Sequence, residues 1–148
     1  MDRKDFIKSC GFACMGGTAM VTLLQSCTAT KIGSAKILGD DLLVPLTSFE
    51  TKAGNEKHYK KYVVVQNDLL QYPICVYRIN ANEYSALWMR CSHQGAELQV
   101  FGDKLQCPAH GSEFDSKGDI QNGPAITKLR TFPIVIEKEQ LKISLKAV

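Results

Sequence analysis

Two short segments of the sequence, Cys91–Ala96 (CSHQGA) and Cys107–Ser112 (CPAHGS), have nearly the same pattern. Each places a cysteine and a histidine within three residues of each other, with a glycine close behind. The two segments contain two of the three histidines in the chain, and ten residues separate them. Thiolate and imidazole groups are both metal ligands, and glycine lets a loop wrap closely around what it binds. A fold that brings the segments together would therefore form a metal site.

The spacing, Cys91-x-His93, thirteen residues and then Cys107-x-x-His110, is compatible with three kinds of site. A structural zinc site accepts two cysteines and two histidines but usually pairs like with like along the chain. A cysteine nucleophile with a histidine base would leave the other segment without a role. A two-iron, two-sulfide cluster explains the division, because each segment can give its cysteine to one iron and its histidine to the other.

The two segments resemble the cluster-binding loops of Rieske iron–sulfur proteins, whose pattern is Cys-x-His, a spacer, and Cys-Pro-x-His-Gly. The resemblance extends through Phe114 and Asp115 to Gly118 and to Gly123-Pro124-Ala125, which is similar to a third loop that covers the cluster. It implies a [2Fe-2S] cluster and a fold of stacked antiparallel sheets with a small cluster-binding subdomain. It further implies that one iron is held by thiolates and the outer, reducible iron by imidazoles, from the four residues Cys91, Cys107, His93 and His110. The protein then tunes a potential that spans roughly −150 to +300 mV across this class.

Several positions near these ligands differ from the family's quinol-oxidising members. Ala96 and Ala109 stand where those members carry disulfide-forming cysteines, so packing, hydrogen bonds and the cluster must hold the loops together. Ser112 matches a serine that donates a hydrogen bond to a cluster sulfur, whereas Phe114 replaces a tyrosine with the same role. Gln94 replaces an apolar leucine. The resemblance therefore implies an intermediate potential, tuned by Ser112, Phe114, Gly95, Gly111 and Pro124.

The rest of the chain predicts an all-β, antiparallel domain. Short runs rich in valine, isoleucine, tyrosine and phenylalanine recur between turn residues such as Gly54-Asn55 and Gly102-Asp103. The expected strands are 37–46, 61–66, 74–79, 84–90, 128–136 and 140–145. Cys75 lies in one of these runs and is expected to be a buried free thiol. The basic stretch 57–61 is expected to be a solvated loop or edge.

The N-terminal segment has the parts of an export signal: basic residues, an apolar stretch and small residues. Residues 3–8 resemble the twin-arginine export motif, and Leu24-Gln25-Ser26-Cys27 resembles a lipobox, which would make Cys27 the site of lipid attachment. We therefore expect an export signal over 1–26, a polar tether over 27–36 and a Rieske domain over 37–148, with its cluster-binding loops within 88–125. The alternative is an uncleaved hydrophobic anchor. Both place the domain on the periplasmic side of the cytoplasmic membrane.

The formal net charge of +3 over 148 residues argues against nucleic acid as a partner, because the lysines are too few and too scattered. The sequence favours one-electron transfer to a redox partner protein. The alternatives are the Rieske subunit of a quinol–cytochrome c oxidoreductase, where an exposed histidine would accept a proton with the electron, and a subunit of a periplasmic arsenite-oxidase-like complex. No catalytic iron domain or flavin motif is visible in the sequence, so any enzymatic activity would belong to a complex.

Overall fold

The structure is a computed structural model of the chain, and it describes residues 31–33, 35–53 and 56–146. The expected export signal and Cys27 lie outside these residues, as do Cys10 and Cys14. Within the described part no helix is long and apolar enough to cross a membrane.

The described chain folds into antiparallel sheets, which confirms the predicted fold class. The central sheet has the order β1-β6-β7-β8-β13, where β1 pairs in parallel with β6 and the other pairs are antiparallel. Its strands are β1 (Lys31–Gly33), β6 (Tyr62–Gln66), β7 (Ile74–Arg78), β8 (Tyr84–Trp88) and β13 (Thr131–Phe132). A second sheet, β14-β15-β3-β2, consists of β2 (Lys36–Leu38), β3 (Asp41–Pro45), β14 (Ile134–Glu137) and β15 (Gln140–Ser144).

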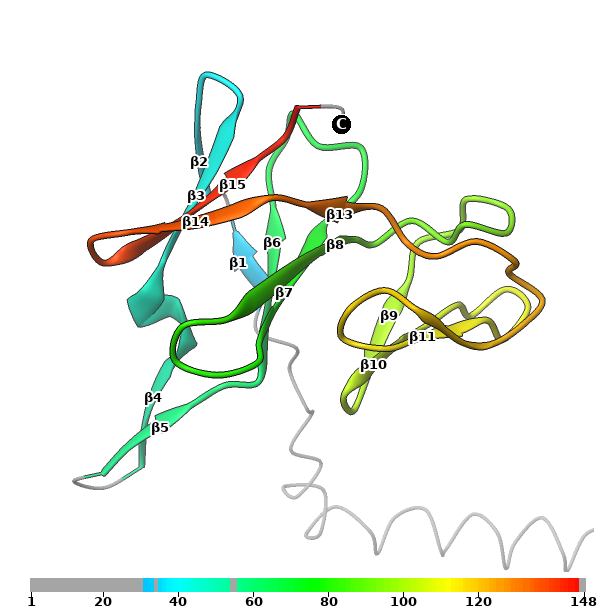
Figure 1. Cartoon of the computed structure of the whole chain (residues 1–148), viewed down its shortest axis with the longest axis horizontal. Coiled ribbons are helices and arrows are strands. Elements are labelled where there is room, and N and C mark those ends of the chain that lie inside the picture. Colours follow the sequence, from blue (N-terminus) through cyan, green and yellow to red (C-terminus); the bar gives the residue numbers. More distant parts are fainter. Residues whose placement is uncertain (1–30, 34, 54–55, 147–148) are drawn as a thin grey trace, which may run out of the picture.

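The third sheet, β12-β11-β10-β9, carries the segments that contain the cysteine–histidine pairs. Its strands are short: β9 (Gln99–Phe101), β10 (Lys104–Gln106), β11 (Glu113–Phe114) and β12 (Ile120–Asn122). In Figure 1 this sheet and its loops form a separate lobe at one side of the molecule, the expected cluster-binding subdomain. A hairpin of β4 (Glu50–Ala53) and β5 (Glu56–Tyr59) projects elsewhere, after the single turn of 3-10 helix η1 (Leu46–Phe49).

The central sheet is buried on both faces, which explains why its strands are nearly continuous apolar runs. On one face Val63, Ile74 and Ala86 pack in a core with the second sheet, including Leu42 and Ile143. On the other face the neighbouring residues of the same strands pack in a second core with the cluster-binding sheet. These residues are Val64, Cys75, Tyr77 and Leu87. The cluster-binding sheet is therefore anchored on the side chains of the central sheet.

Four features differ from the sequence-based expectations. The segment 128–136, expected as one strand, forms β13 and β14, which belong to different sheets. The segment 37–46 forms two strands rather than one, with Gly39 at φ 61° in the turn between them. The short strands β9 to β12 and the exposed hairpin β4–β5 were not predicted, although the basic stretch 57–61 is largely exposed, as expected. Paired structure also begins before Ile37, the expected start of the domain: β1 pairs with β6, and Ala35 is buried in the first core.

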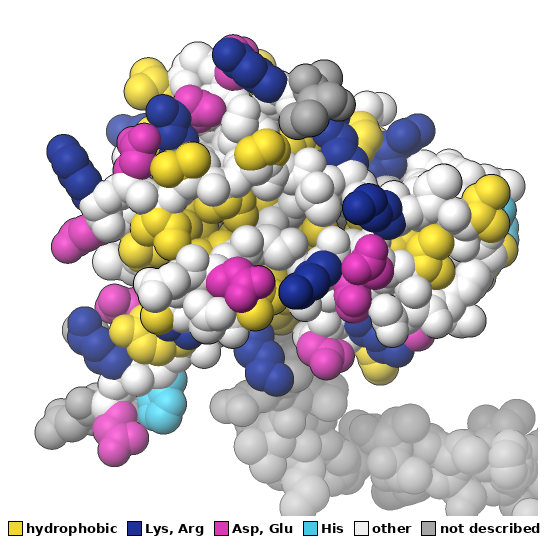
Figure 2. Space-filling view, in the orientation of Figure 1, with side chains coloured by type: hydrophobic (Ala, Val, Ile, Leu, Met, Phe, Trp, Pro, Cys, Tyr) yellow, Lys and Arg dark blue, Asp and Glu magenta, His cyan; other side chains and the backbone are white. Residues whose placement is uncertain are grey.

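Charged side chains of both signs are interspersed on the face shown in Figure 2, where basic side chains do not gather into a stripe. Ion pairs also join neighbouring strands, for example Lys142 with Asp41 and Lys57 with Glu50. A continuous electrostatic footprint for nucleic acid is absent from this face.

Candidate metal centre

Two loops of equal size carry the predicted ligands. Loop 1 (Cys91–Ala96) lies between β8 and β9, and loop 2 (Cys107–Ser112) lies between β10 and β11. In loop 1 the N–H of Gly95 donates to the carbonyl of Cys91 at 2.9 Å, and in loop 2 the N–H of Gly111 donates to the carbonyl of Cys107 at the same distance. The N–H of each cysteine also donates at 2.8 Å to the carbonyl of the residue that ends its loop, Ala96 or Ser112. The repeated sequence pattern thus corresponds to a repeated backbone conformation.

Glycine is required at the same place in both loops. Gly95 has φ 77° and Gly111 has φ 78°, in the left-handed region that residues with a Cβ atom avoid. Gly95 has a second constraint, since a Cβ atom added there would lie 3.2 Å from the guanidinium of Arg90. Gly95 and Gly111 therefore allow the backbone conformation of the loops.

The four predicted ligands come together as two like pairs. Cys91 and Cys107 are 1% and 2% exposed, are not in a disulfide, and are hydrogen-bonded to each other through their thiols. His93 and His110 are exposed, and their ring centroids lie 5.1 Å apart at an interplanar angle of 83°. Each pair takes one residue from each loop. The structure therefore provides an inner thiol pair and an outer imidazole pair.

Burial and hydrogen bonding act in opposite directions on the Cys91 thiol. Burial raises its pKa, and so does the neighbouring thiol of Cys107, whereas the backbone N–H groups of His93 and Gln94 point at the sulfur and lower the pKa. The same N–H groups would stabilise negative charge on a metal-bound sulfur. The site is thus built to accept a thiolate that is paired with a metal.

The donor set fits a binuclear cluster. Among the described residues, no three His, Cys, Asp or Glu side chains converge on a point that could hold one metal ion. One pair of thiols and one pair of imidazoles would suit a two-iron cluster, with Cys91 and Cys107 holding one iron and His93 and His110 the other. Such a cluster, when bound, takes up and releases one electron.

A third loop, 123–127, contacts both ligand loops. The N–H of Ala125 donates to the Ser112 hydroxyl oxygen at 3.0 Å, and the Ser92 hydroxyl donates to the carbonyl of Thr127. Ser112 is fully buried, and because its oxygen accepts this bond, its own proton remains free to be donated. Pro124 follows a cis peptide bond and is exposed beside these contacts. The third loop thus positions the serine hydroxyl that the sequence singled out.

Two residues near the site could not be found from the sequence. The Tyr72 hydroxyl, from the connection between β6 and β7, donates to the carbonyl of Gly95 at 2.7 Å. The Tyr72 ring also packs edge-on against Trp88, with centroids 5.4 Å apart. Twenty-three residues separate Tyr72 from Gly95, and no local pattern signals such a contact. The Tyr72–Gly95 hydrogen bond ties loop 1 to the connection between β6 and β7. Ala96 and Ala109 cannot form a disulfide, so such contacts must hold the loops.

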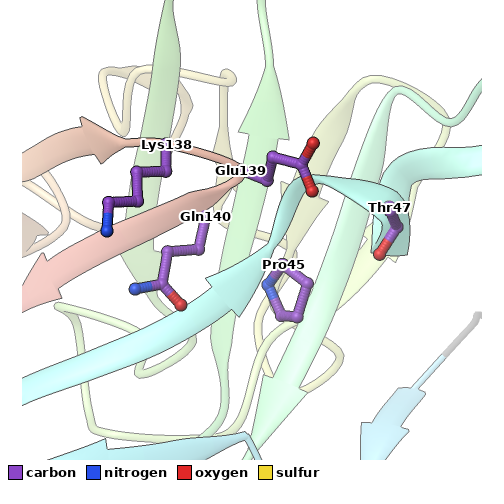
Figure 3. A pocket seen from close by; sticks show the side chains of 5 residues that line it. All are labelled: Pro45, Thr47, Lys138, Glu139 and Gln140. Carbon is purple, nitrogen blue, oxygen red and sulfur yellow. The ribbon is translucent and has the colours of Figure 1, made fainter.

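A hollow of 630 Å³ lies elsewhere in the fold. It is lined by the five residues that Figure 3 labels: Pro45, Thr47, Lys138, Glu139 and Gln140. These residues come from the end of β3, from η1 and from the β14–β15 turn, and none belongs to the ligand loops. The ligand loops therefore do not share this hollow.

Comparison with known proteins identifies the family of this domain. Residues 50–133 match the family model described as Rieske [2Fe-2S] domain. The chain is 37% identical over 65 residues to apoptosis-inducing factor 3 of Mus musculus, covering 41% of this chain and 11% of that protein. It is 36% identical over 56 residues to the cytochrome b6-f complex iron-sulfur subunit of Prochlorococcus marinus, covering 36% of this chain and 32% of that protein. The chain thus spans about a tenth to a third of the length of these relatives.

Among solved structures, the plasma membrane Rieske protein PetC3 from Synechocystis PCC 6803 superposes with a TM-score of 0.50 at 25% identity. The match covers 57% of this chain and 86% of that one. The fold and the matched family model together define an electron-transfer domain that binds a two-iron cluster. The chain belongs to the Rieske [2Fe-2S] domain family, and it binds a [2Fe-2S] cluster.

Proposed function

We propose that this chain carries one electron at a time between redox proteins, with Cys91 and Cys107 on the inner iron and His93 and His110 on the outer iron. The observation that carries the proposal is the separation of the four side chains into a buried thiol pair and an exposed imidazole pair. Exposure of the imidazoles leaves the outer iron within short reach of a docked partner, whereas burial protects the thiolates from oxidation.

The chain offers a matched control for each ligand type. His58 is an exposed histidine on β5, and Cys75 is a buried free cysteine on β7. We expect His93→Ala, His110→Ala, Cys91→Ser and Cys107→Ser each to lose the cluster, and His58→Ala and Cys75→Ala to keep about two irons per chain. Iron content and electron paramagnetic resonance measure the outcome. A cluster retained in any of the four ligand variants would refute the assignment.

For the cellular setting, we propose that Cys27 carries a lipid and that the domain works at the periplasmic side of the cytoplasmic membrane. The support is the lipobox-like sequence ending at Cys27 and the similarity to the plasma membrane Rieske protein PetC3. Mass spectrometry of the mature N-terminus, with Cys27→Ser as the control, tests this proposal. A mature chain that starts elsewhere and lacks a lipid would contradict it.

A quinol-oxidising role is the second candidate, since the relatives include cytochrome b6-f iron-sulfur subunits and both imidazoles are exposed. An exposed imidazole on the reduced cluster can accept a proton, so that a quinol would deliver a proton and an electron together. Quinol-dependent reduction of the purified protein within its native complex would support this role. Copurification with a soluble redox protein and no quinol dependence would favour the simple carrier.

A further inference from the structure

Beside loop 1 lies a cationic surface that we call the arginine flank and define as Trp88, Arg90, Lys128 and Arg130. Trp88 ends β8, and its N–H donates to the carbonyl of Arg130 at 3.0 Å, across the ladder toward β13. The Arg90 and Arg130 guanidinium carbons lie 5.4 and 5.6 Å from the centroid of the Trp88 ring. Two arginines therefore share the single tryptophan of the chain as a common platform.

The charges of the flank are not neutralised within the molecule. Several lysines elsewhere in the fold pair with acids, but over the residues that the structure describes Arg90, Lys128 and Arg130 make no ion pair within 4.0 Å. Glu97 lies opposite Arg90 in an isolated β-bridge, but its carboxylate does not form an ion pair with Arg90 either. Arg130 Nη2 donates to the carbonyls of Leu145 and Lys146 at 3.3 and 3.5 Å, and its guanidinium carbon also lies 4.7 Å from the centroid of the Phe132 ring. These contacts hold the guanidinium in place without a negative charge beside it, so the positive charge remains available to carboxylates of another molecule.

The flank is in direct contact with a ligand loop. The guanidinium of Arg90 lies against Gly95, where an added Cβ atom would be only 3.2 Å from it, and Tyr72 links Trp88 to the Gly95 carbonyl. The three loops themselves, 91–96, 107–112 and 123–127, contain no Asp, Glu, Lys or Arg. The positive charge closest along the chain to the exposed imidazoles thus belongs to Arg90, on one side of the lobe.

We propose that the arginine flank is the docking surface for an acidic redox protein, which exchanges one electron with the cluster past loop 1. This inference rests on the proposed one-electron function. It adds that the partner has a surface rich in carboxylates and that the partner approaches the cluster from the side of loop 1. The reduced cluster gives one electron to the partner's oxidised centre, and no proton or other group is transferred in this step.

Small redox reagents of opposite charge test the flank without a known partner. Ferricyanide and tris(phenanthroline)cobalt(III) each take one electron from the reduced cluster, and stopped-flow absorbance gives the rate. We expect Arg90→Gln/Arg130→Gln to lower the ferricyanide rate about tenfold at 0.01 M ionic strength, and less than twofold at 1 M, because salt screens the lost charges. The same variant should raise the rate with the cobalt complex.

The control pair Lys57→Gln/Lys61→Gln removes the same charge from the exposed hairpin region, and we expect its ferricyanide rate to stay within twofold of wild type. Because Arg90 touches loop 1, Lys128→Gln/Arg130→Gln provides a second variant that leaves loop 1 intact. We expect its ferricyanide rate to fall as well. The midpoint potential of each variant is measured so that rates are compared at equal driving force. Equal rate changes in the flank and hairpin variants would overturn the proposal.

Poly-L-glutamate, a model for an acidic protein surface, provides the second arm. At 0.01 M ionic strength it should slow ferricyanide oxidation of wild type and of Lys57→Gln/Lys61→Gln by occupying the flank, and have at least fivefold less effect on Arg90→Gln/Arg130→Gln. Equal inhibition of all three proteins would overturn the proposal. A protein that shows no cluster signal at the outset would instead refute the proposed function, so the two failures are distinguishable.

Discussion

At the scale of single residues, the buried hydroxyl of Ser112 is the clearest control on the cluster's potential. Its oxygen accepts the N–H of Ala125, so its proton can be donated to a cluster sulfur. Such a bond stabilises the reduced, more negative cluster. We expect Ser112→Ala to lower the midpoint potential by about 60 mV, which corresponds to about 1.4 kcal/mol for one electron. Protein-film voltammetry measures the shift.

Loss of the Ser112 hydroxyl also leaves the Ala125 N–H without an acceptor, so loosening of the third loop must be separated from the direct effect. Ser92→Ala is the matched control, because it removes a different hydrogen bond to the same loop, the one to Thr127. We expect Ser92→Ala to shift the potential by less than 20 mV, roughly a third of the main effect. Equal shifts in both variants would show that loop position, not the donated bond, sets the value.

Phe114 gives the opposite prediction. It is fully buried in the core of the cluster-binding lobe and has no hydroxyl. We expect Phe114→Tyr to raise the potential by about 60 mV if the new hydroxyl donates to the cluster, as the family resemblance implies. Phe132→Tyr adds a hydroxyl to a buried phenylalanine of the other core and should leave the potential unchanged. An unchanged potential in Phe114→Tyr would contradict the role assigned to this position.

At the scale of secondary-structure elements, Tyr72 connects the central sheet to loop 1. We expect Tyr72→Phe to destabilise loop 1 locally by about 1 kcal/mol, the usual net contribution of one hydrogen bond. Amide hydrogen exchange at Gly95 and Cys91, whose N–H groups bond within loop 1, should accelerate about fivefold, and exchange at Gly111 in loop 2 should not. Uniform acceleration in both loops would indicate a global effect instead.

Tyr84→Phe is the matched control for this experiment. The Tyr84 ring packs edge-on against Phe49, and its hydroxyl makes no hydrogen bond within the described residues. Both substitutions remove one tyrosine hydroxyl, but only Tyr72 contacts a ligand loop. Exchange at Gly95 should therefore remain at the wild-type rate in Tyr84→Phe.

The same elements show what the sequence could and could not predict. Strands β6, β7 and β8 of the central sheet were predictable because each contains an apolar run, such as Val63 to Val65, that is buried on both faces. Strand β11 has two residues, too few to show any periodicity, and all four residues of β5 are exposed, so no alternation marks it. The pairing of Cys91 with Cys107 followed from the family resemblance, whereas the Tyr72 bond depends on tertiary packing that no local pattern records.

At the scale of the whole molecule, one sheet supports two cores, and Cys75 lies on the face that anchors the cluster-binding lobe. The sequence predicted a buried free thiol here, and the structure confirms it, with Cys75 fully buried and unpaired in any disulfide. Burial raises the pKa of the Cys75 thiol from 9.0 to about 12. We therefore expect the free energy of unfolding to depend on pH in the alkaline range through this thiol.

Above pH 9 the unfolded chain loses the Cys75 proton that the folded chain retains, so the unfolded state binds fewer protons and stability falls as pH rises. This contribution is fully present below pH 9 and decreases by about 1.4 kcal/mol per pH unit until the folded thiol ionises near pH 12. We expect Cys75→Ala to flatten the pH dependence by that amount between pH 9.5 and 11. Urea unfolding followed by Trp88 fluorescence measures it.

Val76→Ala is the control, because Val76 is equally buried on the opposite face of β7 and does not titrate. It should lower stability by a constant amount at every pH, since a cavity has no proton to lose. Burial also raises the pKa of Tyr77, so part of the alkaline loss should persist in Cys75→Ala and appear only above about pH 10, where an unfolded tyrosine ionises. If the free energy of unfolding of wild type and of Cys75→Ala fell in parallel with pH, ionisation of the Cys75 thiol would not be the cause of the alkaline destabilisation.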